Sequence, residues 1–259
     1  MVNDPRIAPV EDNLLVFYRD VLSAPILTVA ELDGARGYYT DIPFPLCNVV
    51  FDARFDPDRA AEQTRAVLED YIARGLPFLW WATPSTTSPE LERVCAEAGM
   101  VREDVPGMHR PLDGPVEVRL PERLDIRVTT EDQLEVLTHT VLDGFDMPAF
   151  LLEPLQEFYR GLDETKLVNV LASLDGQPVA CGSTYITGTT AGVYNIATLE
   201  AFRGRGIGYA VTAWLMNHAH ERGCTETILH ASPDGLPVYE RLGYETVCTL
   251  PQMVWVPSA

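Results

Sequence analysis

A glycine-rich turn between a strand and a helix is the feature of this 259-residue chain that most restricts its fold. Apolar residues lead into the turn from Asn195, glycines at 204, 206 and 208 form it, and apolar residues recur at helical spacing from Ile207 to Leu215. The first backbone N–H groups of a helix have no partner within it, and the helix dipole favours an anion there. Because glycines let a ligand approach the backbone closely, the segment predicts a strand–turn–helix unit that holds a phosphate group.

The spacing Arg203-x-x-Gly206-x-Gly208, with Tyr239 about thirty residues later in the sequence VYERLGY, resembles the GNAT family of acyl-CoA-dependent N-acyltransferases. The resemblance covers residues 124–256, about half of the chain. It implies an α/β (α+β) fold in which a mixed, mostly antiparallel central sheet is flanked by helices. Another phosphate ligand and a purely structural turn are the alternatives for the glycine segment.

Hydrophobic periodicity and turn residues place the elements of this second half. Strands are expected at 124–128, 166–174, 179–187, 191–198 and 227–232, and two further strands are expected to close the domain. Helices are expected at 130–144, at 147–159, from Ile207 to a cap at Gly223, and in a short stretch through Tyr239. Thr130 and Gln133 have the spacing of a capping box.

The first half repeats part of this order of strands and helices, with fewer of the elements recognisable. Strands are expected at 48–55 and 77–83 and helices at 58–74 and 89–98, with Gly75 and Gly99 after the helices. Prolines at 111, 115 and 121 mark a boundary. We therefore predict two GNAT-like domains, at 1–115 and 123–259. A chance likeness of short glycine and proline patterns is the alternative to a tandem duplication.

The two copies differ at the positions that would carry the chemistry. Where the second half has FRGRGIG, the first has FDPDRAA, in which acidic side chains repel a pyrophosphate and no glycine lets the backbone approach it. Cys95 stands where the second half has Tyr239, four residues before the closing glycine. We expect the first domain to be degenerate and without catalytic activity.

The resemblance implies an acetyl-CoA site in the second domain. The N–H groups of the loop would hold the pyrophosphate, the loop arginines would add positive charge, and the open edge of the preceding strand would pair with the pantetheine arm. The residue that follows the next strand, a serine, is either a pantetheine contact or a turn residue. The residues expected at this site are Ile196, Ala197, Thr198, Arg203, Gly204, Arg205, Gly206, Ile207, Gly208, Tyr209 and Ser232.

Tyr239 is the candidate catalytic residue. In the expected reaction a free amine attacks the thioester, and backbone N–H groups near Ile196 or Thr198 stabilise the oxyanion. The CoA thiolate then needs a proton, which a tyrosine with a reference pKa of about 10 can supply. The family usually keeps its general acid at this position. The alternative is a core aromatic residue on the face of Val238 and Leu242.

The sequence specifies the acceptor side less closely. Segment 141–159 lies where the family builds the acceptor wall, and its acidic and aromatic side chains suit a cationic, partly apolar amine. An acidic surface over core aromatic residues is the alternative reading of the same segment. One histidine, two positions before Ser232, is a candidate base or relay, or simply a packed residue. The residues considered for the acceptor side are Phe145, Asp146, Tyr185, Tyr194, Asn195 and His230.

Composition excludes several other classes of function. The net charge of −19 and the lack of a basic stretch disfavour nucleic-acid binding. The five cysteines are scattered without CxxC or Cys/His spacing, so we expect reduced thiols and no metal. Neither a signal peptide nor an apolar run of about 18 residues is visible, and we expect a cytoplasmic protein that does not enter a membrane.

These observations together predict an N-acetyltransferase that moves an acetyl group from acetyl-CoA to a small-molecule amine or a peptide. The alternatives are a non-catalytic acyl-CoA-binding or sensor protein, and acyl transfer to a hydroxyl or a thiol. The retention of Tyr239 disfavours a sensor, since a sensor needs no proton donor. The sequence leaves both a monomer and a homodimer open.

Overall fold

The computed structural model describes residues 4–118 and 120–257, and the chain forms two compact units. Unit 1 comprises Met1–Ala24 and Gly107–Val247, and unit 2 comprises Pro25–Pro106 and Cys248–Ala259. Each unit therefore combines two separate stretches of the chain. The single cut expected between 115 and 123 does not describe this interleaving, and the assignment of a degenerate and a catalytic domain stays a prediction.

The sheet of unit 1 has the strand order β5-β10-β9-β8-β7-β6. Its strands are β5 (Val101–Pro111, in unit 1 from Gly107), β6 (Leu124–Val128), β7 (Leu167–Leu174), β8 (Gln177–Thr187), β9 (Thr190–Thr198) and β10 (Glu226–His230). Only the β9–β10 pair among these neighbours is parallel. The predicted mixed, mostly antiparallel sheet is thus confirmed.

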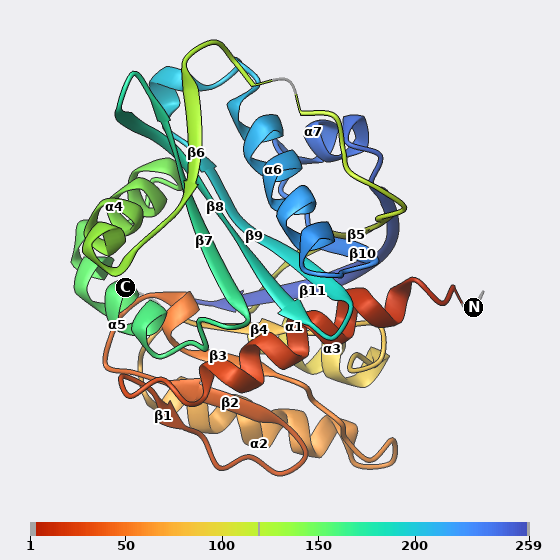
Figure 1. Ribbon diagram of the computed structural model, residues 1–259. Helices are drawn as coiled ribbons and strands as arrows, with labels where there is room; N and C mark the ends of the chain where they lie inside the picture. The colour runs from red at the N-terminus through yellow and green to blue at the C-terminus, as the bar shows by residue number, and fades with distance from the viewer. Residues whose placement is uncertain (1–3, 119, 258–259) are drawn as a thin grey trace. The chain divides into compact units, whose positions relative to one another are not determined.

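Helices cover both faces of this sheet (Figure 1). They are α1 (Ile7–Val21), α4 (Leu134–Gly144), α5 (Leu152–Arg160), α6 (Ile207–Glu221) and α7 (Leu236–Arg241). The capping box at Thr130 and Gln133 precedes α4, as expected. A Cβ on Gly182 would lie 2.8 Å from Val211 of α6, and a Cβ on Gly144 of α4 would lie 2.6 Å from Ala197 of β9. Two glycines therefore let α6 and α4 approach the sheet closely.

The core of unit 1 lies between the sheet and α6. The helix contributes buried alanines and larger apolar residues at the predicted helical spacing, and the strands contribute short apolar runs. Its fully or nearly fully buried members include Ile207, Ala210, Val211 and Leu215 of α6 and Val193 and Leu229 of the strands. This burial, rather than helix propensity, holds α6 and the turn that precedes it in place.

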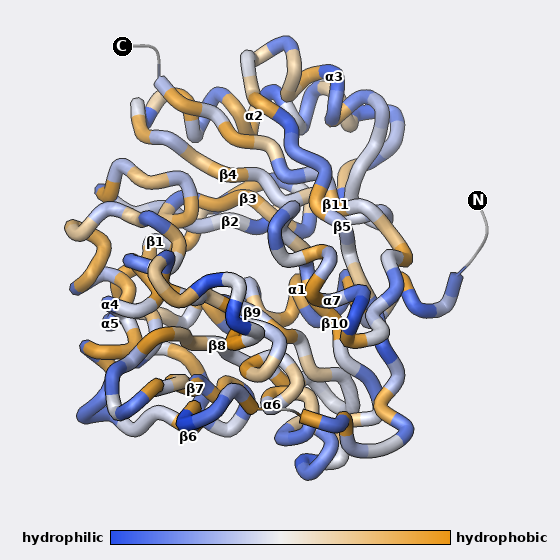
Figure 2. Tube along the Cα trace, turned by 90° about the horizontal axis from the view of Figure 1, so that it is seen from above, coloured by the Kyte–Doolittle hydropathy of each residue, from blue (hydrophilic) through white to orange (hydrophobic). Residues whose placement is uncertain are grey.

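Unit 2 has a smaller sheet in the order β1-β2-β3-β4-β11. Its elements are β1 (Thr28–Val29), β2 (Arg36–Tyr39), β3 (Val49–Phe51), α2 (Ala60–Ala73), β4 (Phe78–Trp81), α3 (Pro89–Glu97) and β11 (Glu245–Trp255, in unit 2 from Cys248). The three residues of β3 are buried and appear as a hydrophobic stretch in Figure 2. Tyr71 of α2 donates its hydroxyl proton towards the carbonyls of Tyr38 and Val49, at 3.1 and 3.0 Å.

Both units contain a strand, a helix and a second strand parallel to the first. In unit 1 these are β9, α6 and β10, and in unit 2 they are β3, α2 and β4. One expectation about the elements was wrong: β11 is one strand where two closing strands were expected. The helix α1 and the strands β1, β2 and β5 were not predicted. Among the described residues, no helix has the length and apolar character needed to cross a bilayer.

Candidate active site

The strands β9 and β10 pair over only part of their length. Their pairing runs from Thr190 and Glu226 to Val193 and Leu229, whereas β8 stays paired with β9 as far as Thr198. The last part of β9 therefore has a strand on one side only, as far as the described residues show. Ile196, Ala197 and Thr198, predicted to pair with pantetheine, lie on this part.

A β-bulge interrupts β9 where the pairing with β10 ends. Ser183 of β8 faces Tyr194, but Cys181 faces Ala197, so two residues of β9 oppose one residue of β8. Asn195 lies in this bulge with a φ of 53°, a left-handed value that is unusual for a residue other than glycine. Its side-chain amide donates to the Tyr159 hydroxyl at 3.1 Å. The sequence pattern gave no indication of this contact, because Tyr159 lies on α5.

The predicted glycine turn leads from β9 into α6. A short 3-10 turn (Glu200–Phe202) follows the strand, and Gly204 and Gly206 have φ values of 75° and 78°. Gly206 is the N-cap of α6, and no side chain caps the helix. The first N–H groups of α6 thus point out of the helix without an intrahelical partner. A Cβ on either glycine would meet no atom within 4 Å, so the left-handed backbone, not crowding, favours glycine there.

The two loop arginines make different contacts. Arg203 donates from Nε to the Thr198 carbonyl at 3.1 Å and from Nη2 to the Gly144 carbonyl at 2.9 Å. Arg205 donates from Nη2 to the Ala201 carbonyl at 3.0 Å, and its guanidinium lies 5.2 Å from the ring centre of Phe202. Both add positive charge near the loop, but Arg203 also joins it to the end of α4.

Tyr239 lies on α7 and is nearly buried, with 8% of its surface exposed. Its ring packs at 6.1 Å, edge to face, against Tyr244, and a Cβ on Gly235 would lie 2.7 Å from it. Burial raises the pKa of Tyr239 to about 12, so the hydroxyl keeps its proton at neutral pH and is a weaker acid than an ordinary tyrosine. Ser232 accepts the Gly235 N–H at 3.2 Å, which is the turn role considered for it.

Tyr194 and His230 lie next to each other at the end of the paired region of β9 and β10. Their ring centres are 5.9 Å apart. Burial lowers the pKa of His230 to about 4, so the imidazole is neutral at pH 7. A neutral imidazole can accept a proton, but this low pKa makes it a weak base.

Two of the residues considered for the acceptor side differ sharply in exposure. Tyr185 is fully buried and its hydroxyl is hydrogen-bonded to the Asp20 carboxylate, so it is not available to an acceptor. Phe145, by contrast, is 46% exposed at the end of α4. Asp146 follows it with a φ of 52°, and Phe150 is 53% exposed. The segment after α4 therefore presents aromatic rings to solvent.

Residues 135–244 match the family model described as Acetyltransferase (GNAT) family. This part of the chain is a GNAT acetyltransferase domain. The match includes the bulged strand β9, the glycine turn and Tyr239. Membership in this family supports acyl transfer from acetyl-CoA as the chemistry of the domain.

Two relatives align with the chain. The uncharacterized protein YyaT of Bacillus subtilis is 31% identical over 77 residues, which is 30% of this chain and 52% of that protein. Acetyltransferase ECA0875 of Pectobacterium atrosepticum is 27% identical over 127 residues, which is 48% of this chain and 89% of that protein. The chain thus spans about half the length of the first relative and most of the second.

Solved structures share the fold over nearly the whole chain. A GCN5-related N-acetyltransferase from Kribbella flavida is 21% identical and has a TM-score of 0.72, covering 98% of this chain and 96% of that one. A tandem GNAT protein from the clavulanic acid biosynthesis pathway is 13% identical, with a TM-score of 0.58 and coverage of 100% and 97%. At these identities the likeness shows the fold alone, and the tandem arrangement is the description of the second of these proteins.

The helix α1, far from the GNAT domain in sequence, packs on its sheet. Asn13 is fully buried and donates its amide to the Tyr185 carbonyl and the Thr187 hydroxyl, at 3.1 and 2.8 Å. Tyr194 donates its hydroxyl to Asn13 Oδ1 at 2.7 Å. Phe17, one helical turn later, stacks on Tyr194 with ring centres 5.3 Å apart. The helix therefore fixes the side chain that precedes the bulge.

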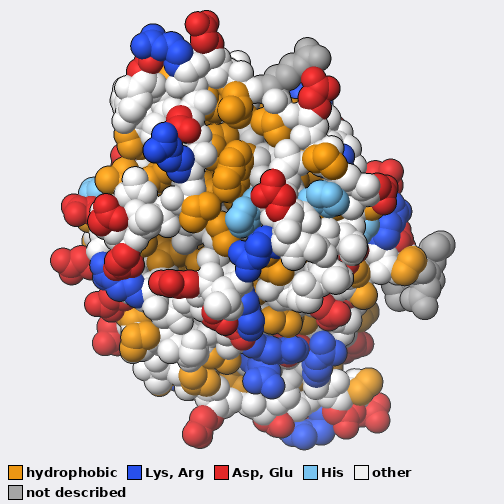
Figure 3. Space-filling model, in the orientation of Figure 1, with side chains coloured by type: hydrophobic (Ala, Val, Ile, Leu, Met, Phe, Trp, Pro, Cys, Tyr) orange, Lys and Arg blue, Asp and Glu red, His pale blue; other side chains and the backbone are white. Residues whose placement is uncertain are grey.

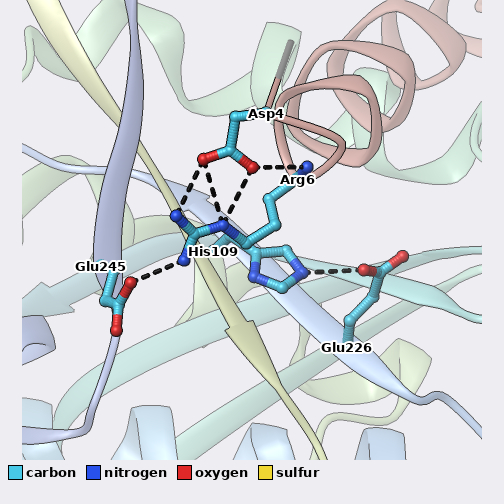
Figure 4. A network of polar contacts seen from close by, with 5 residues as sticks. All are labelled: Asp4, Arg6, His109, Glu226 and Glu245. Atoms are coloured by element: carbon cyan, nitrogen blue, oxygen red, sulfur yellow. Dashed lines mark hydrogen bonds and ion pairs between the residues drawn. The ribbon is translucent and has the colours of Figure 1, made fainter. Parts of the chain in front are cut away.

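Polar contacts also hold the residues just before α1 (Figure 4). Arg6 binds Asp4 and donates to Glu245 at 2.6 Å. Beside this group, His109 of β5 and Glu226 of β10 are 2.8 Å apart. These contacts lie within unit 1, to which residues 4–24 belong. Among the described residues, no group of three or more His, Cys, Asp or Glu side chains is arranged to hold a metal.

Proposed function

We propose that this protein is an N-acetyltransferase that moves the acetyl group of acetyl-CoA to a primary amine, with unit 1 as the active unit. The observation that carries the proposal is the glycine turn at the head of α6. It presents unpartnered N–H groups beside the part of β9 that has no strand on its β10 side. The pyrophosphate of acetyl-CoA fits the first feature, and the amides of its pantetheine arm fit the second.

The reaction that we propose needs three contributions from this chain. N–H groups of the bulged part of β9, near Ile196, stabilise the oxyanion that forms when the amine nitrogen attacks the thioester carbon. The carbon–sulfur bond then breaks, and the CoA thiolate takes a proton from Tyr239, which burial keeps neutral. The amine loses its extra proton through a base, for which His230 is the candidate on the neighbouring strand.

We further propose that unit 2 does not bind acyl-CoA. Ahead of α2, where unit 1 has its glycine turn, the Asp56 carboxylate accepts the Asp58 N–H at 3.0 Å and the Asp56 carbonyl accepts the Arg59 N–H at 2.9 Å. The Gln63 side chain accepts the Asp56 N–H at 3.1 Å. Three backbone N–H groups of this loop are thus already used, and a negative charge lies among them.

Titration calorimetry with CoA is the experiment that tests both proposals. We expect one site per chain and an affinity that falls at least tenfold in Gly206→Val, because a branched residue in a left-handed conformation distorts the turn. Gly223→Val is the matched control: Gly223 also has a positive φ, of 85°, but lies after the other end of α6. Two sites per chain would contradict the proposal for unit 2, and no heat of binding would contradict the acyl-CoA site.

For the acceptor we propose a cationic amine that carries an apolar group. Asp and Glu side chains are spread over the surface seen in Figure 3, so the acidic character of segment 141–159 is not specific to it. The exposed rings of Phe145 and Phe150 are its distinctive feature, since no other Phe, Tyr or Trp side chain among the described residues is exposed.

A panel of arylalkyl amines, hydrophilic amines, alcohols and thiols tests this acceptor class. With the best arylalkyl amine, we expect Phe150→Ala to raise the KM roughly three- to tenfold, the effect of losing about 0.6–1.4 kcal/mol of apolar contact. Val136→Ala is the control, because Val136 is also exposed but lies on the first half of α4. Preference for an alcohol or a thiol would replace N-acetylation, and no turnover with any acceptor would favour a sensor.

A further inference from the structure

The end of α4 is fastened to the loop that we assign to acyl-CoA. The guanidinium of Arg203 bridges two carbonyls, that of Thr198 at the end of β9 and that of Gly144 at the end of α4. Carbonyls in the last turn of a helix have no intrahelical partner, and a cation is favoured beside them. The charge and the N–H donors of Arg203 are therefore both engaged by backbone carbonyls of the protein.

A second contact lies beside this bridge and joins the same two elements. Gly144 approaches β9 so closely that a Cβ on it would lie 2.6 Å from the Ala197 side chain. Ala197 and Thr198 are the residues whose backbone we expect to meet the pantetheine arm. The end of α4 thus rests on the part of β9 that acyl-CoA would occupy.

The segment that carries the acceptor-side rings begins at this point. Phe145 follows Gly144 directly, and its N–H is bonded to the Val141 carbonyl at 3.0 Å. Asp146 has a positive φ, and the Met147 N–H is bonded to the Leu142 carbonyl at 2.8 Å, so the chain turns sharply after the helix. A displacement of the helix end therefore moves segment 145–151, which starts with Phe145 and includes Phe150.

We infer that Arg203 is a positioning residue that couples the acyl-CoA loop to the acceptor-side segment 145–151, so that a ligand in the loop restrains this segment. The inference rests on the proposed function, because it assumes that CoA binds the loop. It gives the two loop arginines different roles. Arg205 is bonded within the loop, to the Ala201 carbonyl, and has no recorded contact with α4 among the described residues.

Hydrogen exchange followed by mass spectrometry on the full chain, with and without saturating CoA, tests this coupling. We expect CoA to slow the exchange of peptides covering 145–151 at least threefold in the parent protein. In Arg203→Met the loop peptides should still be protected, but the protection of 145–151 should be lost. Arg205→Met is the matched control and should retain protection of 145–151 when enough CoA is present to saturate it.

Arg203→Lys separates the bridge from the charge. Lysine keeps the positive charge and most of the aliphatic stem, but its single ammonium group cannot span the two carbonyls as the guanidinium fork does. We expect the coupling to be lost in this variant as well, and it also serves if Arg203→Met does not fold. Coupling that persists in Arg203→Lys would show that the charge acts on the ligand directly, and would overturn the inference.

The outcomes distinguish this inference from the proposed function. If CoA gives no protection anywhere and no heat of binding, the acyl-CoA site is wrong. If CoA binds and protects the loop but leaves 145–151 unchanged in the parent protein, only the coupling is wrong. Equal protection of 145–151 in the parent protein and in Arg203→Met would mean that CoA contacts this segment itself, and would also overturn the role of Arg203.

Discussion

Replacing Tyr239 with phenylalanine is expected to lower the turnover of acetyl transfer by about 10²- to 10³-fold, within the range that general acid catalysis contributes. The ring and its packing against Tyr244 and Gly235 stay, so the affinity for acetyl-CoA should change less than about threefold. Steady-state kinetics give the turnover and calorimetry gives the affinity. A fall in affinity together with turnover would indicate a packing role instead of proton donation.

Tyr244→Phe is the matched control for this variant. Tyr244 is buried beside Tyr239, and its replacement removes the same atom from the neighbouring ring. We expect turnover in this variant to stay within a few-fold of the parent protein. If both tyrosine variants lose turnover equally, the effect belongs to the aromatic cluster and not to a proton donor at Tyr239.

The pH dependence follows from the direction of the pKa shift. Burial moves the pKa of Tyr239 above its usual value, to about 12, because the charged phenolate is poorly solvated there. The donor form is therefore present throughout the range from pH 6 to 10. If turnover falls as the pH is raised within that range, the fall should not be assigned to Tyr239. It should also persist in Tyr244→Phe.

The glycine turn could be predicted from sequence because its signals are local. Gly204 and Gly206 have the left-handed backbone that their residue type suggests, and α6 follows with the apolar spacing that the sequence shows. Helix α4 likewise begins after its predicted capping box. In each case the residues that determine the structure lie within a few positions of one another.

The bulge in β9 and its support could not be predicted in the same way. The bulge depends on the register between β8 and β9, and Asn195 is held there by Tyr159, which is 36 residues away. Nothing in the alternation of β9 shows where a register shift falls. Tyr185 was considered for the acceptor side, but Asp20 of α1 is the hydrogen-bond partner of its hydroxyl.

Helix α1 was missed because its partners lie far away along the chain. Buried polar residues interrupt its apolar periodicity. The most important of them is Asn13, whose side chain packs against a glycine of β9. A Cβ on Gly192 would lie 2.0 Å from Asn13 Oδ1, so the amide fits only over a residue without a side chain. Such a fit between residues 13 and 192 leaves no pattern in either segment alone.

Asn13→Leu is therefore expected to lower the free energy of unfolding by about 2–4 kcal/mol, because it keeps the branched shape but leaves several buried polar partners unpaired. These partners are the Tyr185 carbonyl, the Thr187 hydroxyl and the Tyr194 hydroxyl. The corresponding fall in Tm is roughly 5–15 °C, measured by thermal unfolding. Asp12→Leu is the control on the same helix, since Asp12 is exposed, and it should change the Tm little.

A double-mutant cycle identifies the origin of this loss. Gly192→Ala should destabilise the protein by itself, because the new methyl group would lie 2.0 Å from Asn13 Oδ1 and 2.4 Å from the Tyr194 ring. In Asn13→Ala the first of these two clashes is gone, so adding Gly192→Ala should cost less than in the parent protein. Additive effects would show that the two residues act independently. A less-than-additive cycle would place α1 in direct contact with β9, which makes this N-terminal helix a part of the GNAT unit that residues 135–244 do not include.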